Sequence, residues 1–200
     1  MQEVEPVVRP LEFCGVCKAY GEKRVFRDFD LTAEPGETVI LMGKSGCGKT
    51  TLLHLAAGLR RPDAGTITGV PERIAMVFQE DRLCGEFSPV WNIRLAVNRP
   101  ESEIRAHLEE LGLTAEADCP AETLSGGMKR RVAVARAVLY GGDLLLLDEA
   151  FRGLDGATLR QTAAYVRRHC AGKTILCATH DETVAALLGG HIVRLDAPLN

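Results

Sequence analysis

The residues whose types and spacing most clearly indicate a chemical function lie in the segment GKSGCGKT, from Gly43 to Thr50. The segment has the spacing G-x-x-x-x-G-K-[ST], and its glycines permit backbone angles that turn successive N–H groups toward one centre. The N-terminus of a following helix adds partial positive charge. A polyphosphate anion fits such a loop. We expect Lys49 to neutralise the β and γ phosphates and Thr50 to offer its hydroxyl to Mg²⁺.

A second group of reactive side chains ends the apolar run LLLLDE, where Asp148 and Glu149 are adjacent. The carboxyl ends of parallel strands are where α/β sheets bind ligands, so we expect both carboxylates beside the phosphate loop. Asp148 can hold Mg²⁺ directly or through water, and Glu149 can polarise an attacking water as a general base. The alternative is a pair of capping carboxylates at a strand end.

A second glycine-rich segment, LSGGMKRR, runs from Leu124 to Arg131. Ser125 precedes a predicted helix, so its hydroxyl and the N–H groups of Gly126 and Gly127 suit a phosphate as the first loop does. We call the loop from Gly43 to Thr50 the first cradle and residues 125–127 the second cradle. One nucleotide does not need two anion-binding cradles from the same chain. The alternative is a helix N-cap that binds no ligand.

These groups need a scaffold, and the sequence predicts an α/β fold. Strand-like runs with little polar alternation recur along the chain: ETVILMG, RIAMVFQ, DLLLLDE, KTILCATH and HIVRLD. Strands buried on both faces by helices have this pattern, so we expect a largely parallel sheet. The opening segments LEFCGVCKAYG and KRVFRDFDLTAEPGE instead predict an N-terminal antiparallel β edge with a turn at Gly21.

Strand signals stop between the runs RIAMVFQ and DLLLLDE. The segment ESEIRAHLEELGL places Ile104, Leu108 and Leu111 on one helical face, and GGMKRRVAVARAVLY predicts a second amphipathic helix. We therefore predict a helical subdomain, at about residues 80–142, inserted into a single domain that covers residues 1–200.

The overall composition narrows the classes of partner. With 24 basic and 27 acidic side chains the formal net charge is −3, without a basic stripe, so no nucleic-acid partner is expected. No apolar run is long enough to cross a bilayer, and the N-terminus lacks the basic start and apolar core of a secretion signal. Seven cysteines, scattered mostly in apolar segments, favour a reducing compartment. We expect a cytoplasmic protein.

The motifs GKSGCGKT, LSGGM and LLLLDE, with a histidine ending KTILCATH, resemble in this order the ATP-binding subunit of ABC transporters. The resemblance extends from Leu11 to about Leu195 and implies a P-loop NTPase core that binds ATP and Mg²⁺. In that family, the Leu-Ser-Gly-Gly segment of one subunit faces the phosphate loop of the other, so two ATP molecules are held in a head-to-tail dimer. The second cradle would therefore serve a second copy of this chain.

The resemblance assigns roles to individual positions. It implies catalytic roles for Lys49, Gln79, Glu149 and His180, and Mg²⁺ contacts for Thr50, Gln79 and Asp148. It implies nucleotide contacts for Tyr20, Gly43, Lys44, Ser45, Gly46, Cys47, Gly48, Lys49, Thr50, Thr51, Ser125, Gly126, Gly127 and Asp155.

Four of these residues resemble family positions with distinct tasks. Tyr20 resembles the aromatic that stacks on adenine, with a plain strand-end aromatic as the alternative. Gln79 resembles the glutamine that senses Mg²⁺ at the hinge to the helical subdomain. His180 resembles the switch histidine that contacts the γ-phosphate, and Asp155 resembles the aspartate that communicates across the dimer.

Other positions depart from the family pattern or leave alternatives open. Met128 stands where the family usually has Gln, which removes a hydrogen bond toward the opposing nucleotide, and Ala150 replaces the usual Pro. Arg152 is expected to be a solvated side chain. The thiol of Cys47 is either activated by the helix N-terminus and the nearby lysine or a small filler. The only tryptophan, Trp91, either packs inside the helical subdomain or lies beside a docking groove.

Two functions from different classes are compatible with the resemblance. The first is an ATPase subunit that energises a separate membrane permease from the cytoplasmic face of the membrane, with a solute-binding protein as a further partner. The segment EDRLCGEFSPVWNI resembles importers of the nitrate, sulfonate and taurine type. The alternative is an ATP-gated regulator of a membrane complex that moves no substrate. A GTPase or small-molecule kinase is disfavoured, because no Asn-Lys-x-Asp segment is present.

Overall fold

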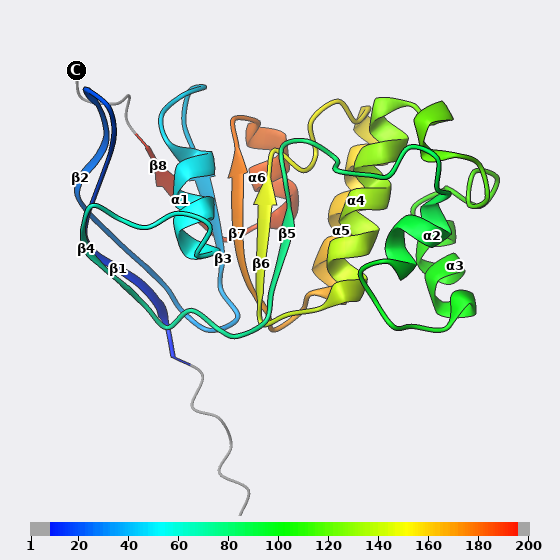
Figure 1. Ribbon diagram of the computed structural model, residues 1–200, viewed down its shortest axis with the longest axis horizontal. Coiled ribbons are helices and arrows are strands. Elements are labelled where there is room, and N and C mark those ends of the chain that lie inside the picture. The colour runs from blue at the N-terminus through cyan, green and yellow to red at the C-terminus, as the bar shows by residue number, and fades with distance from the viewer. Residues whose placement is uncertain (1–8, 196–200) are drawn as a thin grey trace, which may run out of the picture.

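A five-stranded sheet forms the centre of the protein, which the computed structural model describes over residues 9–195 (Figure 1). The strand order is β5-β6-β7-β3-β8, and each neighbouring pair is parallel. The strands are β3 (Thr38–Met42), β5 (Ile74–Val77), β6 (Leu144–Asp148), β7 (Thr174–Thr179) and β8 (His191–Arg194). The parallel sheet predicted from the apolar runs is confirmed.

The inner strands of this sheet are buried on both faces. Every residue of β6 and β7 is buried. Because side chains alternate along a strand, Leu144 and Leu146 of β6 enter one hydrophobic core and Leu145 and Leu147 enter another. The absence of polar alternation in LLLLDE therefore reflects two cores, one on each side of a single sheet.

Helices cover both faces of the sheet. On one face lies α1 (Lys49–Ala56), whose Leu52 and Leu53 are fully buried in the first core. The other face is covered by α4 (Gly126–Tyr140), α5 (Gly156–His169) and α6 (Glu182–Leu188). Consequently α1 and α4 lie on opposite sides of the sheet (Figure 1).

A smaller antiparallel sheet of order β2-β1-β4 adjoins α1. The predicted pairing of β1 (Leu11–Tyr20) with β2 (Lys23–Ala33) is confirmed, with Gly21 in the turn at φ 60°. The third strand, β4 (Ala64–Thr68), was not predicted, because its sequence AGTIT is short and mostly exposed and shows no clear apolar pattern.

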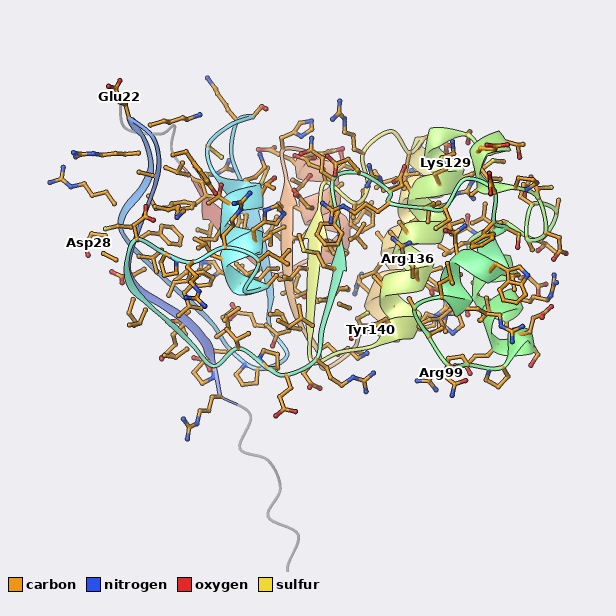
Figure 2. All side chains as sticks on the ribbon, viewed as in Figure 1. Glu22, Asp28, Arg99, Lys129, Arg136 and Tyr140 are labelled. Atoms are coloured by element: carbon orange, nitrogen blue, oxygen red, sulfur yellow. The ribbon has the colours of Figure 1, made fainter. Side chains whose placement is uncertain are left out.

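The chain between β5 and β6 contains only helices as regular elements: α2 (Pro89–Arg94), α3 (Glu101–Glu110), the short 3₁₀ helix η1 (Ala121–Thr123) and α4. Ile104 and Leu108 are fully buried on the predicted face of α3. Leu111 is also buried but follows the last residue of the helix. Charged side chains point outward from the molecule, as Glu22 and Arg99 show (Figure 2).

Leu146→Ala is expected to lower the free energy of unfolding by about 2–5 kcal/mol, because the side chain is fully buried and truncation leaves a cavity. Leu59→Ala is the matched control, since Leu59 is 54% exposed, and it should change stability by no more than about 0.5 kcal/mol. Urea unfolding measures both values. Equal losses in the two variants would contradict the placement of β6 in the core.

Candidate functional site

Three adjacent strands, β3, β7 and β6, end at the same edge of the sheet and carry the predicted polar groups there (Figure 1). The phosphate loop connects the end of β3 to Lys49 at the start of α1. Asp148 is the last residue of β6 and Glu149 follows it, and His180 follows β7. The backbone N–H of Glu149 donates to the carbonyl of Ala178 at 3.0 Å, which continues the β6–β7 pairing into the site.

The phosphate loop takes its shape from glycine conformations. Gly46 and Gly48 have φ values of 82° and 107°, in the left-handed region that other residues rarely adopt. A Cβ atom at Gly48 would lie 2.6 Å from Val25 and 2.7 Å from Phe26, so only glycine lets the loop approach β2 so closely. Lys44, Ser45 and Gly46 are exposed at the mouth of the loop. A bound anion can reach them.

Lys49 is 7% exposed, and its ammonium group is held by the loop itself. Its Nζ donates to the carbonyl of Gly43 at 2.7 Å and to that of Lys44 at 3.4 Å, and it lies 3.8 Å from Oε1 of Glu149. A buried ammonium group needs such partners. A phosphate group entering the loop would offer it stronger, charged ones.

Asp148 is 1% exposed and only half-satisfied. Its Oδ1 accepts a hydrogen bond from the Thr50 hydroxyl at 3.1 Å, whereas its Oδ2 has no partner among residues 9–195. Burial raises the pKa of Asp148, against the hydrogen bond from Thr50 that lowers it. A buried carboxylate oxygen without a partner, beside a hydroxyl, is a hard oxygen donor set of the kind that Mg²⁺ prefers. These residues therefore fit the predicted ion.

Glu149 has an unusual backbone conformation. Its φ is 49°, in the left-handed region, which is strained for a residue with a side chain and is often found at functional positions. Both carboxylate oxygens lie 3.1 Å from Nδ1 of His180. The carboxylate is largely buried, whereas the imidazole is exposed. A largely buried carboxylate oriented by an imidazole is suited to act as a general base.

The second cradle lies apart from the first. Ser125 caps α4, accepting a hydrogen bond from the N–H of Met128 at 3.3 Å, and Gly126 is exposed with open space around it. Because α4 and α1 cover opposite faces of the sheet, this cradle does not join Lys49 and Thr50 within one chain. The phosphate contacts predicted for Ser125, Gly126 and Gly127 remain a prediction.

Three further predicted residues stand at the surface, each at the end of an element. Tyr20 ends β1, is 43% exposed and has the ammonium of Lys18 5.6 Å from its ring centroid. Gln79 is exposed just after β5. Asp155 caps α5, with Oδ1 accepting from the N–H groups of Ala157 and Thr158 at 3.0 Å. This capping role accounts for Asp155 within one chain, and its role between chains remains a prediction.

Burial decides two of the open alternatives. Cys47 is 2% exposed and packs into the core with α1, which favours the filler interpretation of its thiol. Thr51, next to the loop, is partly buried on α1. Trp91 is 54% exposed, with the Arg94 guanidinium 4.9 Å from its ring centroid, which rules out the alternative in which it packs inside the helical subdomain.

Three other residues attract attention in the structure. Met128 packs against the second core, which gives this departure an apolar role, and Arg152 is exposed as expected. His54 of α1, for which no role was predicted, lies near enough that its charge lowers the pKa of Asp148, against the larger effect of burial. Its position four residues after Thr50, on the same helical face, is the signal that could have identified it.

Known protein families and curated proteins resemble this chain in the segments that form the site. The profile of the family described as ABC transporter matches residues 26–152, which is more than half of the chain. The chain belongs to the ABC transporter family. The matched residues include the phosphate loop, the Leu-Ser-Gly-Gly segment and the acidic pair.

Curated relatives in the ABC transporter family are similar over most of the chain. The aliphatic sulfonates import ATP-binding protein SsuB 1 of Paraburkholderia xenovorans is 41% identical over 191 residues, which are 91% of this chain and 56% of that protein. SsuB 3 of Nocardia farcinica is 44% identical over 185 residues, 90% of this chain and 74% of that protein. SsuB 1 of the same organism is 40% identical over 199 residues, which are 96% of this chain and 79% of that protein. The chain thus spans between about half and four fifths of these relatives.

Asp148→Asn should make the nucleotide-free ABC subunit more stable at neutral pH, by about 1 kcal/mol or more, because it removes a buried charge whose Oδ2 has no partner in the described part of the chain. Since burial raises the pKa of Asp148, the unfolded chain loses this proton at a lower pH than the folded chain does. The cost of the charge is therefore absent below the unfolded pKa and complete above the folded pKa. Urea unfolding of both proteins between about pH 3.5 and pH 7 should show their difference growing.

Asp155→Asn is the matched control for this experiment. The backbone N–H of Thr158 lowers the pKa of Asp155, so its charge stabilises the folded chain and the substitution should bring no gain. If Asp148→Asn were less stable than the parent at neutral pH, the unpartnered carboxylate would not be a source of instability.

Proposed function

We propose that this chain is the ATPase subunit of an ABC importer and couples ATP hydrolysis to transport of a solute through a separate membrane permease. The observation that carries the proposal is the cluster of Lys49, Thr50, Asp148, Glu149 and His180 at one sheet edge. It combines a phosphate loop, a cation-binding oxygen pair and an oriented base. The names of the relatives, which describe ATP-binding proteins of sulfonate import, support the transport function.

Phosphate binding uses the loop and its lysine. The triphosphate accepts hydrogen bonds from the loop backbone and from Lys49, whose present carbonyl partners are weaker acceptors. Thr50 and Asp148 would hold Mg²⁺, whose charge offsets that of the phosphates and of the transition state. Tyr20, which ends β1 and is 43% exposed, would stack on the adenine.

Hydrolysis then depends on Glu149. A water molecule attacks the γ-phosphorus while Glu149 accepts a proton from it, and the bond to the β,γ-bridging oxygen breaks to leave ADP and inorganic phosphate. His180 orients the carboxylate through the contact at 3.1 Å and is exposed enough to turn toward the γ-phosphate. Gln79, two residues after the end of β5, would contribute a side-chain oxygen to hold the cation.

The second cradle supports a dimer as the working form. Ser125, Gly126 and Gly127 begin a 15-residue helix and are accessible, which suits an anion brought by another molecule. In a head-to-tail pair of identical chains, each cradle would close over the nucleotide of the other. ATP then joins the two chains, and its hydrolysis removes the link, which gives two states that can move a permease.

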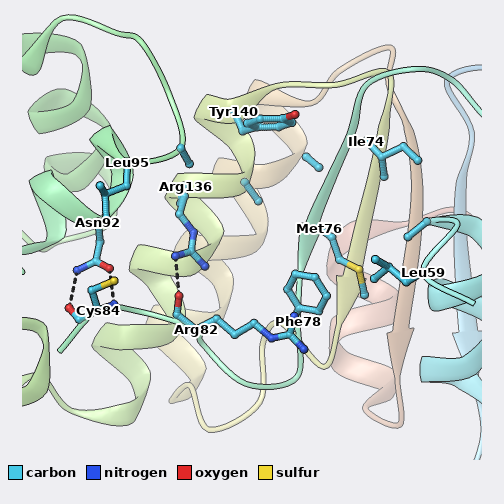
Figure 3. Close-up of a pocket in the computed structure, with 14 residues that line it drawn as sticks. Leu59, Ile74, Met76, Phe78, Arg82, Cys84, Asn92, Leu95, Arg136 and Tyr140 are labelled. Atoms are coloured by element: carbon cyan, nitrogen blue, oxygen red, sulfur yellow. Dashed lines mark hydrogen bonds between the residues drawn. The ribbon is translucent and has the colours of Figure 1, made fainter.

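A groove beside Gln79 is the surface that we assign to the permease. It has a volume of about 440 Å³ and lies between β5, α2, α4 and the turn after α1 (Figure 3). Its lining is largely apolar and includes Leu59, Met76, Phe78 and Leu95. Within residues 9–195 no helix has both the length and the apolar character to span a bilayer. In this proposal the pore belongs to another polypeptide, in keeping with relatives named as ATP-binding proteins of import, and this chain lies on the cytoplasmic face of the membrane.

Two further elements belong to the proposal. Residues from about 80 to 142 act as the helical subdomain, which forms one side of the docking groove and carries the second cradle. A solute-binding protein delivers the solute, for which the relatives suggest an aliphatic sulfonate. The alternative, an ATP-gated regulator that moves no substrate, has the same motifs but lacks the support of the relatives' names.

Glu149→Gln should bind Mg-ATP, hydrolyse it about 10²–10⁴-fold more slowly, and accumulate as a long-lived dimer, because the base is lost while both cradles remain. Sizing chromatography with and without Mg-ATP measures the dimer, and phosphate release measures the rate. Lys49→Ala in the Glu149→Gln background is the control, since loss of nucleotide binding should leave a monomer. A monomeric Glu149→Gln protein at saturating Mg-ATP, in the presence of its permease, would rule out the sandwich.

Leu95→Asp should weaken binding to the permease without unfolding the chain, because Leu95 lines the groove and is 60% exposed. Co-expression with the partner permease, followed by co-purification, measures the effect. Val70→Asp is the matched control, being 39% exposed and outside the groove. Equal recovery of permease with both variants would place the docking surface elsewhere.

A further inference from the structure

The five residues that follow β5, Phe78 to Arg82, are not held by other loops. Among the described residues, no backbone-to-backbone hydrogen bond outside the helices and strands involves this segment. Arg82 has a left-handed φ of 47°, and its guanidinium lies 3.7 Å from the ring centroid of Phe78. Backbone carbonyls removed from water need partners, so the conformation of this segment depends on side chains that reach it from elsewhere.

Arg130 of α4 supplies the partners at the Gln79 end. Its Nη1 donates to the carbonyl of Phe78 at 2.8 Å and its Nη2 to that of Gln79 at 2.7 Å. The residue is 8% exposed. Its Nη1 also lies 3.1 Å from Oδ1 of Asp81, which forms no hydrogen bond within residues 9–195 and so meets the guanidinium as an ion pair only. Burial raises the pKa of Asp81, and the charge of Arg130 opposes that rise.

A second arginine of the same helix holds the other end of the segment. Arg136 donates through Nη1 to the carbonyl of Arg82 at 2.8 Å (Figure 3) and through Nη2 to that of Asp81 at 3.0 Å. Figure 2 shows Arg136 nearer the middle of α4 than Lys129, which marks the end where the second cradle lies. The two arginines together bind four of the five carbonyls from Phe78 to Arg82.

The position of Arg130 connects two parts of the proposed site. It follows the cap residue Ser125 by five positions within one helix, so it moves with Gly126 and Gly127. Gln79 is exposed, and its side chain forms no hydrogen bond in the part of the chain that the structure describes. Its placement therefore depends on its backbone, whose carbonyl Arg130 holds.

We propose that Arg130 is a positioning residue: by holding the carbonyls of Phe78 and Gln79 it places the Gln79 side chain at the nucleotide and joins that position to the cradle that begins α4. This inference rests on the proposed function, in which Gln79 acts at a bound nucleotide and the cradle acts on a second one. A change at Gln79 on nucleotide binding is thereby transmitted to Ser125 through one guanidinium. Only Arg provides the planar fork that two neighbouring carbonyls require.

The first test is the steady-state rate of the full-length chain. Arg130→Met should lower kcat by about 10–100-fold through misplacement of Gln79, and should leave the Kd for ATP nearly unchanged because the phosphate loop is intact. The Mg²⁺ concentration for half-maximal rate should rise. Arg130→Lys keeps the charge opposite Asp81 but not the fork, so it should lose most of the same rate.

Arg73→Met is the matched control. Arg73 precedes β5 and donates to the carbonyl of Tyr140 at 2.9 Å, so it makes the same kind of bond to α4 at the end remote from Gln79. Its removal should leave kcat and the Mg²⁺ dependence unchanged. If the role of Arg130 is purely structural, Arg130→Met should have a lower Tm and an unchanged Mg²⁺ dependence. If Arg130 positions Gln79, the Mg²⁺ dependence should shift in Arg130→Met or Arg130→Lys even where the Tm of that variant stays near that of the parent.

The second test needs no hydrolysis. Hydrogen exchange of the monomer is compared with and without Mg-ATP, at a protein concentration where sizing chromatography shows no dimer. In the parent, nucleotide should slow exchange at residues 79–83 and also at the first turn of α4. In Arg130→Met or, if that variant does not fold, Arg130→Lys, the change at α4 should be lost while that at the phosphate loop remains.

The outcomes separate this inference from the proposed function. If the parent hydrolyses ATP and Arg130→Lys matches it in kcat, Mg²⁺ dependence and exchange at α4, Arg130 has no positioning role. If the parent hydrolyses no ATP even with its permease, the proposed function fails, and the exchange experiment still decides whether Arg130 links the two segments. Loss of rate together with loss of the exchange change at α4 supports the link.

Discussion

The parallel pairing of β7 with β3 on one side and with β6 on the other is the constraint on which the candidate site depends. It brings together residues that are about a hundred positions apart, such as Thr50 and Asp148, whose side chains meet at 3.1 Å. Parallel strands end at one edge of a sheet, so the loop after β3, the carboxylates after β6 and the histidine after β7 can act on one ligand. A change in this strand order would separate them.

The same edge concentrates groups that are unfavourable for the folded chain. Asp148 is buried with an oxygen that no described residue partners, Lys49 is a buried cation, and Glu149 has a strained backbone. Each of these features costs stability, and two large cores on either side of the sheet offset the cost. Such strained and half-satisfied groups are suited to a ligand that brings charge of both signs, as a nucleotide with its cation does.

Much of the fold was readable from the sequence because its signals are local. The apolar runs gave the parallel strands, and the 3.6-residue periodicity gave α3 and α4, since burial on both faces or on one stripe leaves a direct record. The sequence of β4 shows no such apolar pattern, because AGTIT pairs through its backbone while its side chains are mostly exposed to solvent. Burial of Cys47 and exposure of Trp91 depend on neighbours distant in sequence, so neither was predictable.

The candidate site shows the same division. The phosphate loop, the acidic pair and the N-cap of α4 are short motifs whose chemistry is visible in the letters. The bonds from Arg130 to Phe78 and Gln79 join residues 52 and 51 positions apart, and an arginine in an amphipathic helix otherwise suggests only a solvated side chain. Arg130 is only 8% exposed, so it is not a solvated side chain, and this burial can be seen only in the folded structure.

The strand order has a consequence for biosynthesis. β3 is made early, yet both of its neighbours, β7 and β8, come from the last part of the described chain, and Thr38 pairs with Ile175. Contacts so distant in sequence form slowly, and a growing chain on the ribosome cannot make them until β7 has been synthesised. Until then, the apolar strand that leads into the phosphate loop has neither of its two neighbouring strands, and its apolar side chains stay exposed to association with other molecules.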